Sequence, residues 1–384
     1  MQSLDRFAQD TLDDLQRRHL RRALAETVRE DGIWVERDGK RLLSFSCNDY
    51  LNLTQHPAIK QAAIAAIETY GAGSGASRLV TGNHPLYAQL EARLASIKQT
   101  QAAVVFGSGY LANTGIIPVL IGRDGLMLAD ELSHACLFAG AQLSHGKLMT
   151  FRHNDVALAR ELLSAHRAEH DHVLIVTDGG FSMDGVLAPL AELLALANEP
   201  DAWLMSDDAH GLGVVGGGRG SSFVGNTHIP SPVQMGTLSK AVGAYGGYLC
   251  ASEPVIDLIR NRARTLVYST GLPPSCVAAA IAALDLIERE PGYAALPVQK
   301  AKAFTRAAGL REAQSPIVPV IVGEEAATLA ASRLLADEGF LAAAIRPPSV
   351  PAGTARLRLT FTAQHPDDAI QRLADIVRDK ILRR

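Results

Sequence analysis

Residues 203–210 read WLMSDDAH, a short apolar run followed at once by two carboxylates and a histidine. An apolar run of this length is typical of a buried strand in a parallel sheet. Similar runs, separated by helical segments, occur at 102–106, 126–129, 148–151, 173–177, 233–238 and 248–251. Strands that alternate with helices connect by right-handed crossovers, which place helices on both faces of the sheet. The sequence therefore predicts an α/β fold with a mostly parallel central sheet.

Unusual polar clusters follow these apolar runs directly. They are GSGY at 107–110, ELSH at 131–134, GGFSMDG at 179–185, DDAHG at 207–211 and TLSK at 237–240. Ligands of open α/β sheets bind outside the carboxyl ends of the strands. We therefore expect these clusters to meet in one site.

The two ends of the chain have a different texture. Residues 4–30 carry leucines and a phenylalanine at roughly helical spacing, which predicts an amphipathic helical arm. The apolar runs 33–35 and 42–45 around Asp38-Gly39 predict a hairpin. A helix is expected around 275–290, and the Pro291-Gly292 pair then reads as a break. Beyond it we expect strands at 317–322 and 356–361 and helices at 325–339 and from about 367, which together form a small α+β domain.

These patterns divide the chain into three predicted parts. Residues 1–45 form the arm and hairpin, 46–290 the large α/β domain, and 291–384 the small domain. A length of 384 residues agrees with more than one domain in one chain.

Composition narrows the class of protein. With 47% hydrophobic and 20% charged residues the chain can build a large core, and its net charge of −3 gives no general attraction to nucleic acid or anionic membranes. No run of 18 apolar residues predicts a membrane span, and the charged first thirty residues do not resemble a secretory signal. The four cysteines are widely spaced without a CxxC or a histidine cluster, so no metal site is expected. A cytoplasmic enzyme that acts on small molecules is the expectation.

Asp207 and Lys240 suggest the chemistry. A carboxylate at a strand end and a lysine on a neighbouring loop suit pyridoxal phosphate, because the lysine amine forms the Schiff base and the acid keeps the pyridinium nitrogen protonated. Thr237 and Ser239 add hydroxyl groups suited to a phosphate, and the glycine turn at Gly109 opens a helix whose amino-terminal N–H groups favour the same anion.

Several longer motifs carry a resemblance. They are FSCNDYLNL at 45–53, GAGSGASRLVTGNHPLYAQLE at 71–91, DELSHACL at 130–137, DGGFSMDGVLAPL at 178–190, SDDAHGLGVVG at 206–216, TLSKAVGAYGGY at 237–248, YSTGLPP at 268–274 and RPPSVPAGTARLRLT at 346–360. With these motifs the chain resembles the α-oxoamine synthase family of fold-type I pyridoxal-phosphate enzymes over most of its length. It departs from the usual pattern at Asn52 and Ala241, where that family often has glycine.

The resemblance implies a role for individual residues around the cofactor. Lys240 would be the Schiff-base lysine, Asp207 the partner of the pyridine nitrogen and His134 the ring stacked on the cofactor. Ser182 and His210 would bind its phenolic oxygen, Gly109 and Tyr110 would lie beside it, and Thr237 would hold the phosphate. Thr270 would reach the phosphate of the neighbouring subunit in a homodimer with shared active sites. The positions implied near the substrate are Arg22, Asn48, Ser349 and Arg358, with His134 also in contact; Arg21 is adjacent to Arg22 and could take its place.

The same resemblance implies a reaction. It points to decarboxylative condensation of L-alanine with a pimeloyl thioester, carried by coenzyme A or by acyl carrier protein. Two glycine-using relatives stay open as alternatives, 2-amino-3-ketobutyrate ligase and 5-aminolevulinate synthase. A non-catalytic partner subunit is disfavoured because Lys240, Asp207 and His134 are all present.

A dinucleotide-binding alternative rests on one glycine pattern. Gly211, Gly213 and Gly216 match GxGxxG, which should open a βαβ unit and be followed by an acid about twenty residues later. Position 231 is a serine in a proline-rich stretch, so this hypothesis is weak.

Overall fold

The computed structural model describes residues 2–18 and 20–383. They form two compact units: one comprises residues 48–299 and 314–316, the other residues 2–18, 20–47, 300–313 and 317–383. The three-part division expected from the sequence stays a prediction.

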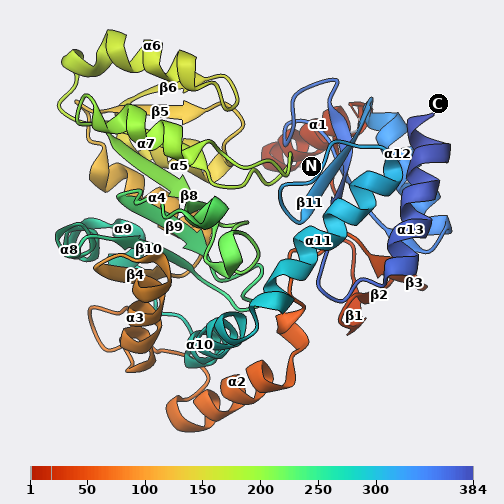
Figure 1. The fold of residues 1–384 in the computed structure, drawn as a ribbon, viewed down its shortest axis with the longest axis horizontal. Coiled ribbons are helices and arrows are strands. Elements are labelled where there is room, and N and C mark those ends of the chain that lie inside the picture. The colour runs from red at the N-terminus through yellow and green to blue at the C-terminus, as the bar shows by residue number, and fades with distance from the viewer. Residues whose placement is uncertain (1, 19, 384) are drawn as a thin grey trace. The chain divides into compact units, whose positions relative to one another are not determined.

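The larger unit is built on a seven-stranded sheet with the order β4-β10-β9-β8-β7-β5-β6 (Figure 1). Its strands are β4 (Ala102–Phe106), β5 (Leu126–Asp130), β6 (Lys147–Phe151), β7 (Val173–Asp178), β8 (Trp203–Asp207), β9 (Val233–Thr237) and β10 (Gly247–Ala251). All neighbours pair in parallel except β10, which runs antiparallel to β4 and β9. The predicted strands and the mostly parallel sheet are confirmed.

Successive side chains of β5 point to opposite faces of the sheet, and each face is covered by a layer of helices. Met127 and Ala129 pack with α4 (Gly109–Leu120), α5 (Ala135–Ser144) and α8 (Glu253–Arg262). Leu126 and Leu128 face the other way and pack with α6 (Val156–His166) and α7 (Leu190–Asn198). Because successive strand residues point to opposite faces, both faces of the sheet are covered by helices, as predicted.

Further helices complete this unit. They are α2 (Pro57–Tyr70), α3 (Leu86–Lys98), the short α9 (Arg264–Val267) and α10 (Pro274–Arg289). α10 packs on α2 and α3, and α3 packs on β4. The break expected at Pro291-Gly292 is found one residue earlier: α10 ends at Arg289, Glu290 is not helical, and Pro291 and Gly292 form the first turn of a new helix, α11 (Pro291–Ala308). Proline is tolerated in a first turn, where its missing N–H would have no helical partner.

The smaller unit contains two sheets, ordered β1-β2-β3-β12 and β11-β14-β13. The predicted hairpin is confirmed as β2 (Trp34–Arg37) and β3 (Lys40–Ser44). Asp38 and Gly39 both have positive φ, 52° and 70°, as the favoured two-residue hairpin turn requires. The other strands and helices are β11 (Ile317–Gly323), α12 (Glu325–Asp337), β12 (Phe340–Leu341), β13 (Ala343–Ile345), β14 (Ala355–Thr360) and α13 (Asp367–Ile376).

Aromatic residues form the centre of the core of the smaller unit. Phe45 makes edge contacts with Phe340 and Phe361, at centroid distances of 5.8 and 5.4 Å. Its ring also stacks on His365 at 3.9 Å. These buried rings join β3, β12 and β14 to the segment before α13.

The helical arm is shorter than predicted. α1 spans Ser3–Arg17, and residues 28–31 form strand β1, which pairs with β2. The helical periodicity therefore fails beyond Arg17, because cross-strand backbone hydrogen bonds to a neighbouring strand override a weak local helical pattern. Among the helices that the structure describes, none is long and apolar enough to cross a membrane.

Candidate functional site

A cavity of about 300 Å³ opens at the carboxyl ends of β4, β5, β7, β8 and β9. Its walls bring together the predicted cofactor residues Gly109, Tyr110, His134, Ser182, Asp207, His210, Thr237 and Lys240. These side chains are up to 131 positions apart in sequence, from Gly109 to Lys240, and the parallel strands gather them at one edge. Their individual roles stay predictions.

Asp207 is a buried carboxylate held by two donors. Its Oδ2 accepts a hydrogen bond from Asn113 Nδ2 at 2.7 Å, and its Oδ1 accepts one from the backbone N–H of Ala209 at 3.0 Å. Asn113 lies on α4 and is fully buried. Charge-assisted bonds of this kind fix the carboxylate at the end of β8, where it can face a cationic ring nitrogen.

His134 precedes α5, and its orientation is set by Cys136. The His134 Nδ1 atom accepts from the backbone N–H of Cys136 at 3.3 Å and lies 2.8 Å from Cys136 Sγ. Because a backbone N–H can only donate, Nδ1 is an acceptor, and the neutral imidazole carries its proton on Nε2. Burial lowers the pKa of His134, and this effect outweighs the charge of Asp207, which raises it. The lowered pKa favours the neutral imidazole.

The Cys136 thiol links the histidine to the carboxylate. Asn113 Nδ2 donates to Cys136 Sγ at 3.1 Å as well as to Asp207. Burial, together with the charge of Asp207, raises the pKa of Cys136 to about 12, so sulfur stays a thiol. Asp207, Asn113, Cys136 and His134 form one continuous polar chain beneath the cavity.

A second carboxylate, Asp178, lies beside Asp207 in register on β7. Its Oδ1 accepts from the backbone N–H of His134 at 3.2 Å. Complete burial and then repulsion from Asp207 raise the pKa of Asp178 well above its usual range. Two adjacent buried carboxylates make this end of the cavity suited to a positively charged group.

Lys240 follows β9 and contacts His210. The distance between Lys240 Nζ and His210 Nε2 is 2.8 Å, and the other ring nitrogen of His210 lies 2.7 Å from the hydroxyl of Tyr50. The Tyr50 hydroxyl also lies 3.3 Å from Asn48 Oδ1. The predicted substrate residue Asn48 is thereby connected to the lysine through two side chains.

The start of α4 and the end of β9 together form a candidate phosphate-binding site. Ser108 caps α4 by accepting from the N–H of Leu111 at 3.2 Å. A Cβ on Gly109 would lie 3.3 Å from Met235 and 3.5 Å from Thr237, so glycine allows this close approach. A helix amino terminus is a ready anion site, and the Thr237 hydroxyl beside it donates to the carbonyl oxygen of Gly246 at 2.7 Å. With Lys240 and Asp207 at the same cavity, the residues fit pyridoxal phosphate.

Five predicted residues are not among those that line this cavity: Asn48, Thr270, Arg22, Ser349 and Arg358. Thr270 does not line it and forms an isolated bridge with Ser77. Arg22, Ser349 and Arg358 belong to the smaller unit, where Arg22 Nη2 donates to Ser349 Oγ at 3.0 Å and Arg358 lies on β14.

The glycines at 211–216 serve packing instead of dinucleotide binding. No α-helix follows them; residues 216–218 form a short 3-10 turn. A Cβ on Gly211 would lie 1.9 Å from Asp208 Oδ1, and Gly213 has a φ of +88°. Asp208 makes a buried ion pair with Lys98, with 2.6 Å between Oδ2 and Nζ. The glycine segment 211–216 therefore packs against a buried carboxylate.

Sequence reasoning missed Tyr50, Asn113, Cys136 and Asp178 as site residues. Asp178 carried the best signal, since it ends an apolar run as Asp207 does. Asn113 and Tyr50 sit inside motifs that were singled out, but only the folded chain shows which side chains point inward. At Asn52 the φ of 54° explains why glycine would also suit this position.

Comparisons with known proteins show the family of this chain. The family model for aminotransferase class I and II matches residues 40–377. Proteins described as 8-amino-7-oxononanoate synthase from Methylocella silvestris and Beijerinckia indica are 68% and 60% identical, over 90% and 98% of this chain and 98% of each relative.

Solved structures show the same fold. A serine palmitoyltransferase variant from S. paucimobilis with a bound PLP–myriocin aldimine has a TM-score of 0.91 at 27% identity, covering 98% of both chains. A structure of 8-amino-7-oxononanoate synthase from Francisella tularensis has a TM-score of 0.77 at 24% identity, covering 88% of this chain and 98% of the other.

Proposed function

Because the chain belongs to the class I and II aminotransferase family, we propose that it catalyses the pyridoxal-phosphate-dependent formation of 8-amino-7-oxononanoate in biotin biosynthesis. The reaction joins L-alanine to a pimeloyl thioester and releases carbon dioxide and the thiol carrier. The observation that carries this proposal is the cavity that places Lys240, Asp207 and His134 together, in a chain up to 68% identical to relatives named for this activity.

Particular residues would hold the cofactor. Lys240 would bind its aldehyde carbon, Asp207 its ring nitrogen and His134 its ring face. Gly109 and Tyr110 would lie beside the cofactor, and Thr237 would hold its phosphate. Ser182 and His210 would bind the phenolic oxygen. When bound, pyridoxal phosphate supplies an electron sink for the pair left at the amino-acid Cα. The anchoring of Asp207 by Asn113 keeps its carboxylate in place to maintain a proton on the ring nitrogen.

The chain's own groups would move the protons. Lys240 Nζ is a base of the right kind to take the proton from Cα and return it later, and a positioned base contributes about 10²–10⁴-fold to such a step. His210, 2.8 Å from this amine and itself held by Tyr50, would orient it. His134, neutral through burial, would present its Nε2–H to the substrate carboxylate without adding a second full positive charge.

Substrate selection would depend on Asn48, Ser349, Arg358 and Arg22. Guanidinium groups bind carboxylates in a bidentate manner, which suits Arg358 for the carboxylate of the amino acid and Arg22 for the acyl substrate. The bond from Arg22 to Ser349 supports a joint role for the arm and the loop at 346–352. Coenzyme A and acyl carrier protein both remain candidate carriers.

A homodimer with shared active sites would complete each centre. Thr270, which does not line the cavity of its own chain, would bind the phosphate held by the partner subunit. Large apolar side chains are exposed around this region, among them Leu79, Val80 and Tyr268, with exposed fractions of 62%, 75% and 74%. Exposed apolar groups of this size favour burial by a second copy. A small-molecule synthase of this kind would work in the cytoplasm.

A product assay tests the proposed function. The purified protein with pyridoxal phosphate, L-alanine and pimeloyl-CoA should yield 8-amino-7-oxononanoate, measured by mass spectrometry, whereas Lys240→Ala should yield none. Glycine with acetyl-CoA or succinyl-CoA tests the ligase and aminolevulinate alternatives. Faster turnover with either glycine pair than with L-alanine and pimeloyl-CoA would refute the assignment.

A further inference from the structure

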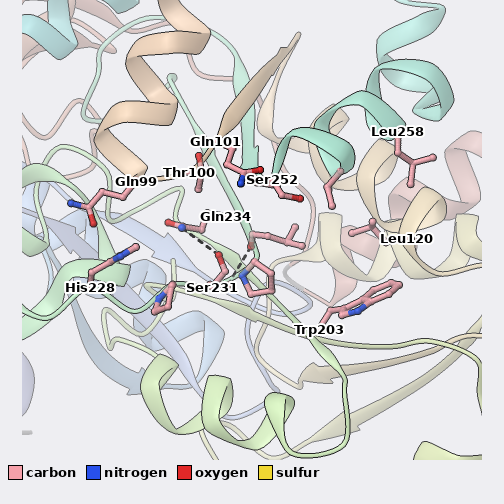
Figure 2. Close-up of a pocket in the computed structure, with 15 residues that line it drawn as sticks. Gln99, Thr100, Gln101, Leu120, Trp203, His228, Ser231, Gln234, Ser252 and Leu258 are labelled. Carbon is pink, nitrogen blue, oxygen red and sulfur yellow. Dashed lines mark hydrogen bonds between the residues drawn. The ribbon is translucent and has the colours of Figure 1, made fainter.

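A second cavity, of about 710 Å³, lies at the opposite edge of the large sheet. It is lined by residues at the start of β8 and β9 and at the end of β10, including Trp203, Val233 and Ala251 (Figure 2). None of the described residues lines both this cavity and the one that contains Lys240. Its volume is within the range of about 300–1,000 Å³ that is usual for small-molecule sites.

One side of this cavity is apolar. Leu120 of α4, Trp203 of β8, and Val255 and Leu258 of α8 contribute to it. Among the described residues, the lining includes no aspartate, glutamate, lysine or arginine. Burial, followed by the nearby positive charges of Arg219 and Lys98, lowers the pKa of His228, the one titratable side chain among the described residues of the lining, which favours the neutral ring at physiological pH. The electrostatics of the cavity therefore favour an uncharged ligand.

Gln234 gives the cavity a specific polar group. Its side chain is 1% exposed, and its Nε2 donates to the carbonyl oxygens of Lys98 and Ser231 at 3.4 and 3.3 Å. Its Oε1 is buried and has no hydrogen-bond partner among the residues that the structure describes. Because Nε2 has two acceptors, the amide orientation is fixed, and Figure 2 shows this amide extending toward Gln99 and His228. A buried carbonyl without a donor is costly, so it marks a place where a ligand N–H or O–H gains a bond.

His228 provides a second such atom. Its ring stacks on Phe223 at a centroid distance of 4.6 Å, and its buried Nε2 has no partner. Two fixed polar atoms beside an apolar wall are the usual composition of a binding pocket, in which a few polar groups orient a mainly apolar ligand.

We propose that this cavity binds an uncharged, amphiphilic small molecule. Its apolar body packs against Trp203 and Leu258, and an O–H or N–H group donates to Gln234 Oε1. The site is separate from the cavity that contains Lys240, and an uncharged ligand fits it better than a dicarboxylate or a phosphorylated compound, because no charged side chain among the described residues lines it.

Tryptophan fluorescence offers a direct test. The chain has two tryptophans, so Trp34→Phe leaves Trp203 as the reporter inside the cavity. The probes are 2-cyclohexylethanol, which carries an O–H donor, and its methyl ether, which does not. We expect both probes to change Trp203 emission saturably in the Trp34→Phe holoenzyme, with the alcohol bound about 2- to 10-fold more tightly, the ratio expected for one hydrogen bond.

Two further variants separate the parts of the proposal. Gln234→Leu in the same background should abolish the preference for the alcohol while both probes still bind. Val255→Phe should take up part of the space beside Trp203 and Leu258 and weaken the binding of both probes, with the cofactor absorption band unchanged. The proposal is overturned if no saturable change occurs, if the alcohol and the ether bind equally in the parent, or if Val255→Phe binds the probes as the parent does. Because Val255→Phe keeps an apolar residue, it tests the cavity even where Gln234→Leu fails to fold.

Discussion

Replacing Lys98 by methionine removes one half of an ion pair that has no access to solvent. Lys98 Nζ lies 2.6 Å from Asp208 Oδ2 and donates to the carbonyl oxygen of Arg219 at 3.0 Å, and the side chains of Lys98 and Asp208 are both 0% exposed. Asp208 Oδ1 keeps its bond from the N–H of Ser221 at 2.9 Å, but the negative charge loses its counter-ion.

The expected cost follows from this isolation. Removing one partner of a buried ion pair costs about 3–5 kcal/mol, because the remaining charge stays buried without compensation. Urea unfolding followed by circular dichroism should therefore show Lys98→Met destabilised by about that amount. The double variant Lys98→Met/Asp208→Leu should be more stable than the single one, since it removes the stranded charge as well.

A surface pair supplies the control. Lys40 and Asp337 lie 3.0 Å apart with exposed fractions of 56% and 71%, so Lys40→Met should leave the unfolding midpoint nearly unchanged. If Lys98→Met costs less than about 1 kcal/mol, or costs no more than Lys40→Met, the argument that the glycine segment 211–216 encloses a charge that must be paired is wrong.

Three other outcomes follow from the contacts. Burial lowers the pKa of His365 from 6.5 to about 3, so below pH 6.5 the unfolded chain binds a proton that the folded chain does not bind. The free energy of unfolding should therefore fall by up to about 1.4 kcal/mol per pH unit below 6.5. The urea midpoint of His365→Phe should depend less on pH than that of the parent. Tyr50→Phe removes the hydroxyl 2.7 Å from His210 and should lower kcat about 3- to 10-fold, and unchanged kcat would contradict that role. Cys136, a buried thiol with a pKa of about 12, should resist iodoacetamide at pH 8 until urea is added, as peptide mass spectrometry would show.

The central sheet was predictable because most of its strands are buried along their length; the exception is the edge strand β6, where only Phe151 is buried. Each run of four to six mainly apolar residues that predicts a strand coincides with one of the seven strands of the sheet. The strand β1 was not predictable in this way. Val28–Asp31 reads VRED, with one apolar residue, and it becomes a strand only because β2 offers it a partner edge.

The candidate site was predictable in its location more than in its connections. Strand ends fixed where Asp207 and Lys240 would meet, since parallel strands finish at one edge. The bond from Asn113 to Asp207 could not be foreseen, because it joins the inward face of a helix to a strand 94 residues away. The cavity beside Gln234 had no sequence signal, since it depends on what neighbouring elements leave unfilled.

The visible absorption spectrum of the purified protein tests the central claim most directly. With pyridoxal phosphate bound to Lys240, the protein should show an absorption band that Lys240→Ala lacks, and L-alanine should shift that band at a lower concentration than glycine or L-serine. Absence of the band after addition of pyridoxal phosphate would contradict the assignment of Lys240 and Asp207 as the cofactor site, and a stronger response to glycine would contradict the choice of L-alanine.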